Sequence, residues 1–203
     1  FDALLAYARA HPGRVTYPAP PDFTGSAFVR QAVQSLGADR AFALLRELRP
    51  LLYQGGVNQP MDETALEDLF ANGQVDLAMS YNPNFVDTAV KAGRFPATTR
   101  PYTFTTGTLQ NVSFLAIPNT SANQAGAAVV ANLLTSPELQ AAKLTQVGIP
   151  TVLDPGRLGD QAGPLGTVPS SPYTLTSFGT PLDELPADQV TALDKRWITE
   201  VTP

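Results

Sequence analysis

The chain of 203 residues is 43% hydrophobic and carries a formal net charge of −5, from 18 acidic and 13 basic side chains. This length can bury a sizeable core in one large or two small domains, and an acidic balance without runs of Lys or Arg argues against a nucleic-acid partner. The lack of cysteine excludes disulfides, Cys-based zinc sites and thiol nucleophiles, and no apolar stretch approaches membrane-spanning length.

The first forty residues predict a helix, a strand and a second helix. The first helix covers Asp2 to His11, and the β-branched and aromatic residues of Arg14 to Tyr17 predict a buried strand. Three prolines follow and end the strand, because they remove backbone donors. The next helix is expected to be capped by Thr24 or Ser26 and to stop at Gly37.

The same order recurs in the next fifty residues. Helical patterns cover Asp39 to Arg49 and Asp62 to Asn72, with Asp62 as the N-cap of the second. The segment Val75 to Ser80 predicts another buried strand, and Asn82 is expected to cap a helix with Pro83 in its first position. Two strand-to-helix junctions therefore follow one another along the chain.

Parallel strands present their carboxyl ends at one edge of a sheet, where open α/β sheets bind ligands. Thr24, Gly25 and Ser26 at the first junction and Tyr81 and Asn82 at the second are therefore expected to lie side by side. Taken alone, the first junction is also consistent with a capped helix at a tight turn, since no phosphate-loop or dinucleotide pattern is present, and Tyr81 and Asn82 alone are typical of an anchored helix start.

The second half of the chain predicts fewer features of this kind. The remaining expected elements are a strand from Gln110 to Ile117, a helix that Ser121 opens with Gln124 as its capping-box partner, a helix from Pro137 to Val147, a long surface loop from Asp154 to Thr180, and a final helix from Pro186 that places Trp197 in the core.

Three stretches carry a resemblance to a known family: VTYPAPPDFTGSAF from Val15, VDLAMSYNPN from Val75, and GTLQNVSFLAIPNTSANQAGAAVVANLLTSPELQ from Gly107. Together they resemble the solute-binding proteins of bacterial ABC transporters, in the branch that includes thiamine-, iron- and polyamine-binding proteins and, within it, the YnjB-like group. The C-terminal LDKRWITEV is similar to the terminal helix of that family. The resemblance covers nearly the whole chain, but its motifs specify a scaffold rather than a solute.

The resemblance implies an α/β fold of the type II periplasmic-binding-protein kind, with one near-complete lobe and part of the other. Residues 1–104 are expected to form the second lobe with its lead-in helix, and residues 105–203 the return crossing and the C-terminal part of the first lobe. The N-terminal part of the first lobe is expected to precede Phe1.

The function implied is that of an extracytoplasmic or periplasmic component of an ABC importer, which captures a small polar solute between two lobes and delivers it to a permease and an ATPase in the membrane. No cofactor, metal or catalytic residue is expected. Helix N-termini favour an anionic solute and aromatic and acidic residues a cationic one; the family branch favours a cationic or zwitterionic solute. The ligand-binding residues expected are Thr24, Gly25, Ser26, Tyr81, Asn82, Thr106, Gly107 and Asn111.

Two other classes of function stay open at this point. A hydrolase or transferase on the same architecture would need acid–base groups. The pair Glu63 and Glu67 is separated by one helical turn and indicates a solvated polar face, and the single histidine, His11, suits a helix end. An effector-sensing module of a transcription regulator would need a DNA-binding partner domain.

Overall fold

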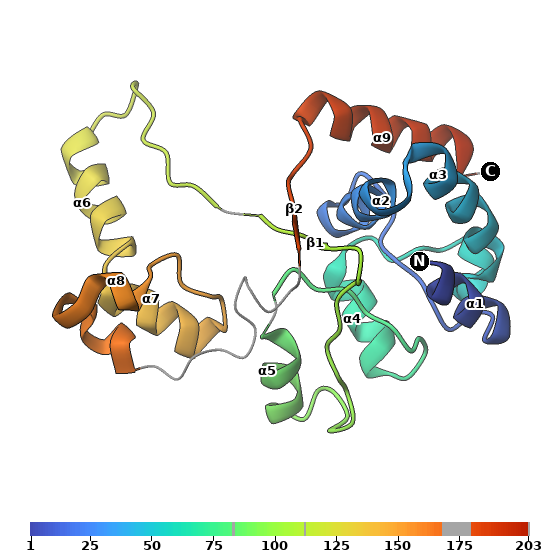
Figure 1. The fold of residues 1–203 in the computed structure, drawn as a ribbon, viewed down its shortest axis with the longest axis horizontal. Coiled ribbons are helices and arrows are strands. Elements are labelled where there is room, and N and C mark those ends of the chain that lie inside the picture. The colour runs from blue at the N-terminus through green and yellow to red at the C-terminus, as the bar shows by residue number, and fades with distance from the viewer. Residues whose placement is uncertain (83, 112, 168–179, 203) are drawn as a thin grey trace.

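The computed structural model describes residues 1–82, 84–111, 113–167 and 180–202. Figure 1 shows a larger helical body, formed by the N-terminal half and the last helix, and a smaller body that contains α6, α7 and α8. An extended segment that leads to α6 connects the two bodies.

Helices dominate the larger body. It contains α1 (Asp2–Ala10), α2 (Phe23–Leu36), α3 (Ala38–Leu48), the 3-10 turns η1 (Arg49–Leu51) and η2 (Tyr53–Gly56), α4 (Glu63–Ala71), α5 (Phe85–Lys91) and α9 (Ala187–Glu200). The remaining elements are β1 (Thr108–Leu109), α6 (Gln124–Leu134), α7 (Pro137–Ala142), the π-helical turn η3 (Lys143–Val147), α8 (Pro155–Leu158), η4 (Gly159–Thr167) and β2 (Pro181–Leu182).

The predicted helices are present, but three of them have an N-cap other than the predicted one. Asp22, not Thr24 or Ser26, caps α2, because its side chain accepts hydrogen bonds from two backbone N–H groups at 2.9 Å. Asn123 rather than Ser121 caps α6. Helix α5 follows Asn84 rather than Asn82; the expected role of Pro83 lies outside the described residues.

The predicted N-cap Asp62 is confirmed, and Ser136 caps the helix predicted from Pro137. The Asp62 carboxylate accepts a hydrogen bond from the backbone N–H of Ala65 at the start of α4, and the Ser136 hydroxyl accepts one from Leu139 in α7. Both helices therefore begin where a polar side chain satisfies an otherwise unpaired donor.

The predicted strands are largely absent from the described residues. Within Arg14 to Tyr17, only Val15 forms a bridge, with Leu52, and Arg14 O accepts a hydrogen bond from Asp76 N at 2.8 Å. The prolines after Tyr17 cannot donate, so the pairing does not continue. The segment Val75 to Ser80 is not assigned as a strand.

The described part of the predicted strand Gln110 to Ile117 has no strand either. Its apolar side chains face solvent, with Phe114 88% exposed, so they lack the packed face that stabilises a strand. The only strand pair in the described residues is β1 with β2, which run parallel over two residues each. The fold is therefore mixed but helix-rich, and the predicted α/β sheet is only fragmentary.

The predicted surface loop from Asp154 to Thr180 was wrong in its first part. Helix α8 and turn η4 occupy residues 155–167, and η4 packs against α7. Ala162 and Leu165 are buried in this packing, which explains why the segment is folded despite its glycines and prolines. Residues 168–179 of the predicted loop lie outside the described part.

Helix α9 packs on α2 and α3 and completes the core of the larger body. Trp197, only 2% exposed, donates a hydrogen bond from Nε1 to the hydroxyl of buried Tyr17 at 3.0 Å. Burial raises the pKa of Tyr17 to about 12, so the hydroxyl stays protonated at neutral pH. The prediction that Trp197 lies in the core is confirmed.

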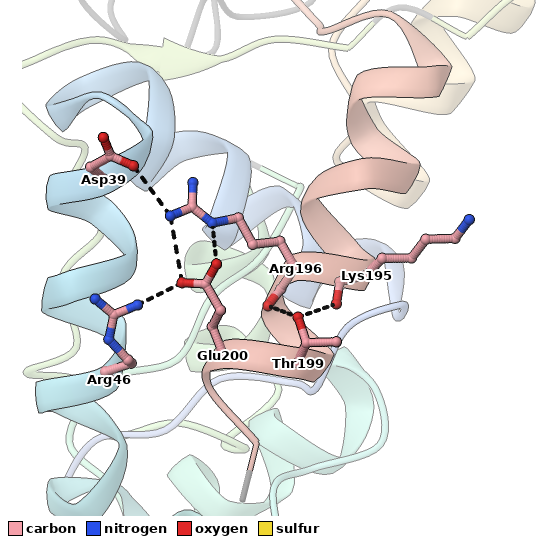
Figure 2. Close-up of polar contacts among 6 residues, drawn as sticks. All are labelled: Asp39, Arg46, Lys195, Arg196, Thr199 and Glu200. Carbon is pink, nitrogen blue, oxygen red and sulfur yellow. Dashed lines mark hydrogen bonds and ion pairs between the residues drawn. The ribbon is translucent and has the colours of Figure 1, made fainter.

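Charged side chains align α9 with α3 at the surface (Figure 2). Arg196 contacts Glu200 in its own helix and Asp39 in α3, and Arg46 of α3 contacts Glu200. The Arg196 guanidinium also lies 4.2 Å from the centre of the buried Phe42 ring. Exposed ion pairs add little stability, so the apolar contacts beneath them carry most of this packing.

No helix in the described ranges is both long and apolar enough to cross a membrane.

Replacing Trp197 with alanine should lower the free energy of unfolding by about 3–5 kcal/mol, because the change leaves a cavity and an unpaired buried hydroxyl. Urea denaturation followed by circular dichroism measures this change. Ile198→Ala is the matched control, because Ile198 is the next residue of the same helix and is 49% exposed. Equal effects of the two changes would contradict the role assigned to Trp197.

Candidate functional site

A cavity of about 450 Å³ lies where the start of α2, the start of α4 and the start of α5 approach one another. Part of its wall comes from the turn after η3, which belongs to the smaller body. Its lining combines carboxylates, hydroxyls and aromatic rings: Asp22, Phe23, Thr24, Asp62, Glu63, Thr64, Glu67, Ser80, Tyr81, Asn82, Phe85, Val147 and Ile149.

Three of the residues predicted to bind ligand line this cavity: Thr24, Tyr81 and Asn82. The two junctions predicted to be neighbours therefore do lie together, although the sheet expected to align them is fragmentary. The ring of Phe23 contacts that of Tyr81 across the two junctions, and the Thr24 hydroxyl donates to the Glu63 carboxylate of α4 at 3.3 Å.

Gly25 and Ser26 lie behind the cavity wall rather than in it. A Cβ on Gly25 would lie 2.1 Å from the carbonyl oxygen of Pro18, so glycine is needed for this close approach. The buried Ser26 hydroxyl donates to the Asp194 carboxylate of α9 at 2.6 Å. Both residues position the start of α2.

Thr106, Gly107 and Asn111 do not line the cavity. The Thr106 hydroxyl bonds to that of Ser35 at 2.8 Å, near the far end of α2, and the carbonyl of Gly107 accepts from Gln31 at 2.8 Å. Asn111 is exposed. From Thr24 to Ser35, α2 extends over about 16 Å, so the predicted residues fall into two separate groups.

The four carboxylates of the cavity differ in what they are bonded to. Asp22 and Asp62 cap α2 and α4, and Glu67 forms an ion pair with Arg94 at 2.8 Å. Glu67 is buried, so the expectation of a solvated Glu63–Glu67 face is wrong for this residue. Glu63 accepts a hydrogen bond from the uncharged hydroxyl of Thr24 at 3.3 Å.

Partial burial raises the pKa of the Glu63 carboxyl, and the negative charge of Glu67 raises it further. The nearby hydroxyl of Ser80 and the hydrogen bond from Thr24 lower the pKa. Sequence reasoning missed Glu63 as a site residue. The available signal was its place directly after the N-cap Asp62, which puts it in the first turn of α4 beside the cavity.

Aromatic rings form the apolar part of the lining. The ring of Tyr81, which is 71% exposed, meets that of Phe23 edge to face, with the centroids 6.0 Å apart. Phe85 adds a third ring, and the Arg94 guanidinium lies 5.8 Å from its centre. Two exposed rings at a cavity mouth are available to contact a bound molecule.

The turn at Val147 to Ile149 contacts the cavity from the smaller body. The side-chain amide of Asn82 donates to the carbonyl of Val147 at 3.3 Å, and the amide of Asn84 donates to that of Gly148. Gly148 adopts a φ of 76°, which favours glycine. Asn82 therefore links the two bodies at the edge of the cavity.

Glu63→Gln should stabilise the protein at pH 7, because a carboxyl with a raised pKa in the folded state opposes folding when ionised. The stability of the wild type should rise toward that of the variant as the pH falls from 7 to 4.5, the ordinary pKa of a glutamate side chain. Melting temperatures across this range measure the difference. A variant less stable than the wild type at pH 7 would contradict the argument.

Comparison with known proteins gives two matches. The family model of the bacterial extracellular solute-binding proteins matches residues 1–155. Over 178 residues the chain is 36% identical to Protein YnjB of Escherichia coli (strain K12), an alignment that covers 78% of this chain and 46% of that protein. The chain thus spans about half the length of this relative. No solved structure matches the chain. From the extent of the family match, the chain belongs to the bacterial extracellular solute-binding protein family.

Proposed function

We propose that the protein is the extracytoplasmic solute-binding component of an ABC importer, which captures a small polar solute and delivers it to a membrane permease driven by an ATPase. The observation that carries this proposal is the cavity of about 450 Å³, which lies between the larger body and a turn of the smaller one. A cavity of this volume suits a small organic molecule. Membership of an extracellular solute-binding family supports a periplasmic or extracytoplasmic location.

Capture requires that the solute shift a balance between open and closed arrangements of two lobes. We propose that the chain divides into its two lobes between residues 104 and 105, in the type II arrangement of the family. Helix α9 comes after this division in the sequence, but it packs on α2 and α3, which come before it. The hydrogen bond from Asn82 to Val147 crosses the division beside the cavity, so bonds of this kind would form on closure.

The proposal gives the predicted residues different parts. Thr24 and Tyr81 would contact the solute from the cavity wall, and Asn82 would contact it or hold the closing turn. Gly25 and Ser26 would set the position of the wall. Thr106, Gly107 and Asn111 would act at the crossing between the lobes, where β1 pairs with β2.

The lining does not favour the alternative of a hydrolase or transferase. The Glu67 carboxylate is occupied by Arg94, so the Glu63–Glu67 pair does not offer one free acid and one free base. Solute-binding families are in general not enzymatic.

The direct test uses the protein expressed from its complete gene in its own host. Native mass spectrometry should show a copurified small molecule, and a thermal-shift screen of small polar solutes should find compounds that raise the melting temperature, because binding to the native state stabilises it. Protein without a copurified molecule and without any stabilising solute would contradict the proposal.

Tyr81→Ala should weaken the binding of such a solute by more than about tenfold, because it removes an exposed ring from the cavity wall. Isothermal titration with the copurified molecule or the best screening compound measures the affinity. Tyr102→Ala is the control, since Tyr102 is an exposed tyrosine that does not line the cavity. Unchanged affinity of the Tyr81 variant would remove this residue from the site.

A further inference from the structure

We infer that α2 fixes the crossing of the two extended segments that contain β1 and β2, and that Gln31 is the residue that positions it. The crossing consists of residues 106–110 and 180–184, and the segment that leads to α6 departs from it (Figure 1). The crossing therefore moves with the larger body when the two bodies close on a solute. This inference rests on the proposed function, since it says which part of the chain stays fixed during closure.

The side-chain amide of Gln31 takes the place of a neighbouring strand at one edge of β1. Its Nε2 donates to the carbonyl of Gly107 at 2.8 Å, and its Oε1 accepts from the N–H of Leu109 at 2.9 Å. A partner strand would bond to the same two backbone groups, because every second residue of an extended chain directs its pairing groups to the same edge. One side chain thus satisfies a whole edge of the two-residue strand.

Strand β2 occupies the opposite edge of β1. The N–H groups of Thr108 and Gln110 donate to the carbonyls of Thr180 and Leu182 at 3.0 and 3.3 Å. Strand β1 is therefore bonded on both edges, to the backbone of β2 on one and to a helix side chain on the other. Gln31 is only 6% exposed, so removal of its amide would leave buried backbone groups without partners.

Two further side chains of α2 hold the residues that follow β2. The buried Arg30 forms an ion pair with Glu184 at 2.7 Å, and Gln34 donates from its side chain to the carbonyl of Asp183 at 2.9 Å. A buried guanidinium keeps its partner because an unpaired buried charge costs several kcal/mol. Gln31 and Gln34 lie on one face of α2, three residues apart, so one face of this helix holds both segments of the crossing.

Gly107 shows that the two segments pack without spare room. Its φ of 115° favours glycine, and a Cβ at this position would lie 2.8 Å from the carbonyl oxygen of Thr180 and 2.9 Å from the side chain of Leu182. Hinge residues absorb large changes of φ and ψ, and a crossing bonded on both edges and packed this closely does not allow them. The bending therefore falls outside residues 106–110 and 180–184.

Helix α2 also joins the crossing to the cavity. Thr24, in the first turn of the helix, lines the cavity, and Gln31 lies two turns further along the same helix. The cavity wall at Thr24 and the crossing therefore keep one relative position. When the smaller body moves, this wall and the crossing stay together as parts of one rigid element.

The first test is hydrogen exchange on the protein expressed from its complete gene, without solute. Gln31→Met keeps a side chain of similar length but removes both hydrogen bonds. Peptides that cover residues 106–110 should exchange at least about tenfold faster in this variant, because the N–H of Leu109 loses its acceptor. Gln189→Met is the control, since Gln189 is an exposed residue of α9. Unchanged exchange in the Gln31 variant would overturn the inference.

The second test keeps Gln31 in place and measures distances between spin labels by electron paramagnetic resonance. The 203 residues contain no cysteine, so labels attach within them only at introduced ones. Ala43 of α3, Asp183 of the crossing and Asn132 of α6 are exposed positions for the labels. The distance from residue 43 to residue 183 should have one narrow distribution, and that from 43 to 132 a broader one. Gln31→Met should broaden the first distribution.

A bound solute, either the copurified molecule or the best screening compound, should shift the distance from 43 to 132 and leave the distance from 43 to 183 unchanged. A shift of both would overturn the inference and leave the proposed function standing. So would a 43-to-183 distribution as broad as the other one in the free protein. Failure of every solute would contradict the proposed function alone, because the measurements without solute still decide whether α2 fixes the crossing.

Discussion

The hydrogen bond from Trp197 to Tyr17 joins the two parts of the chain on which the larger body depends. Both side chains are buried, so neither polar group could find water if the other were removed. The bond holds α9 on the segment that precedes α2, and Asp194 of the same helix accepts a hydrogen bond from Ser26 at the start of α2. The position of Thr24 at the cavity therefore depends on a contact that lies well behind it.

The four carboxylates that line the cavity differ in their hydrogen-bond and ion-pair partners. Asp22 and Asp62 accept hydrogen bonds from backbone N–H groups at the N-termini of α2 and α4, where the helix dipole favours a negative charge. Glu67 is matched by Arg94. Glu63 accepts a hydrogen bond from the uncharged hydroxyl of Thr24, and the described residues give it neither a helix-capping bond nor an ion pair.

Helices were predictable from the sequence because their signals are local. Caps such as Asp62 and Ser136 and stops such as Gly37 act within a few residues. Where several polar residues adjoin, as at Asp22 to Ser26, the cap itself was misplaced, because any of them could accept the same bonds. Strands need partners distant in sequence, and the segments predicted as strands form only isolated pairings here.

The cavity was predictable only in part. Adjacent strand-to-helix junctions indicated Thr24, Tyr81 and Asn82. Glu63 was missed because its relation to Glu67 was judged from helical spacing alone, which cannot show that Arg94 takes one carboxylate and leaves the other. The grouping of Thr106 and Gly107 with the far end of α2 depends on side-chain bonds to Ser35 and Gln31 that have no sequence signature.

The bond between Ser26 and Asp194 spans 168 positions of sequence. A ribosome synthesises α2 long before it reaches α9, so the cavity wall acquires this support only after α9 has been made. Contacts of such separation form slowly, since a long loop must close first. During that interval the start of α2 lacks the contact that holds it in the finished structure.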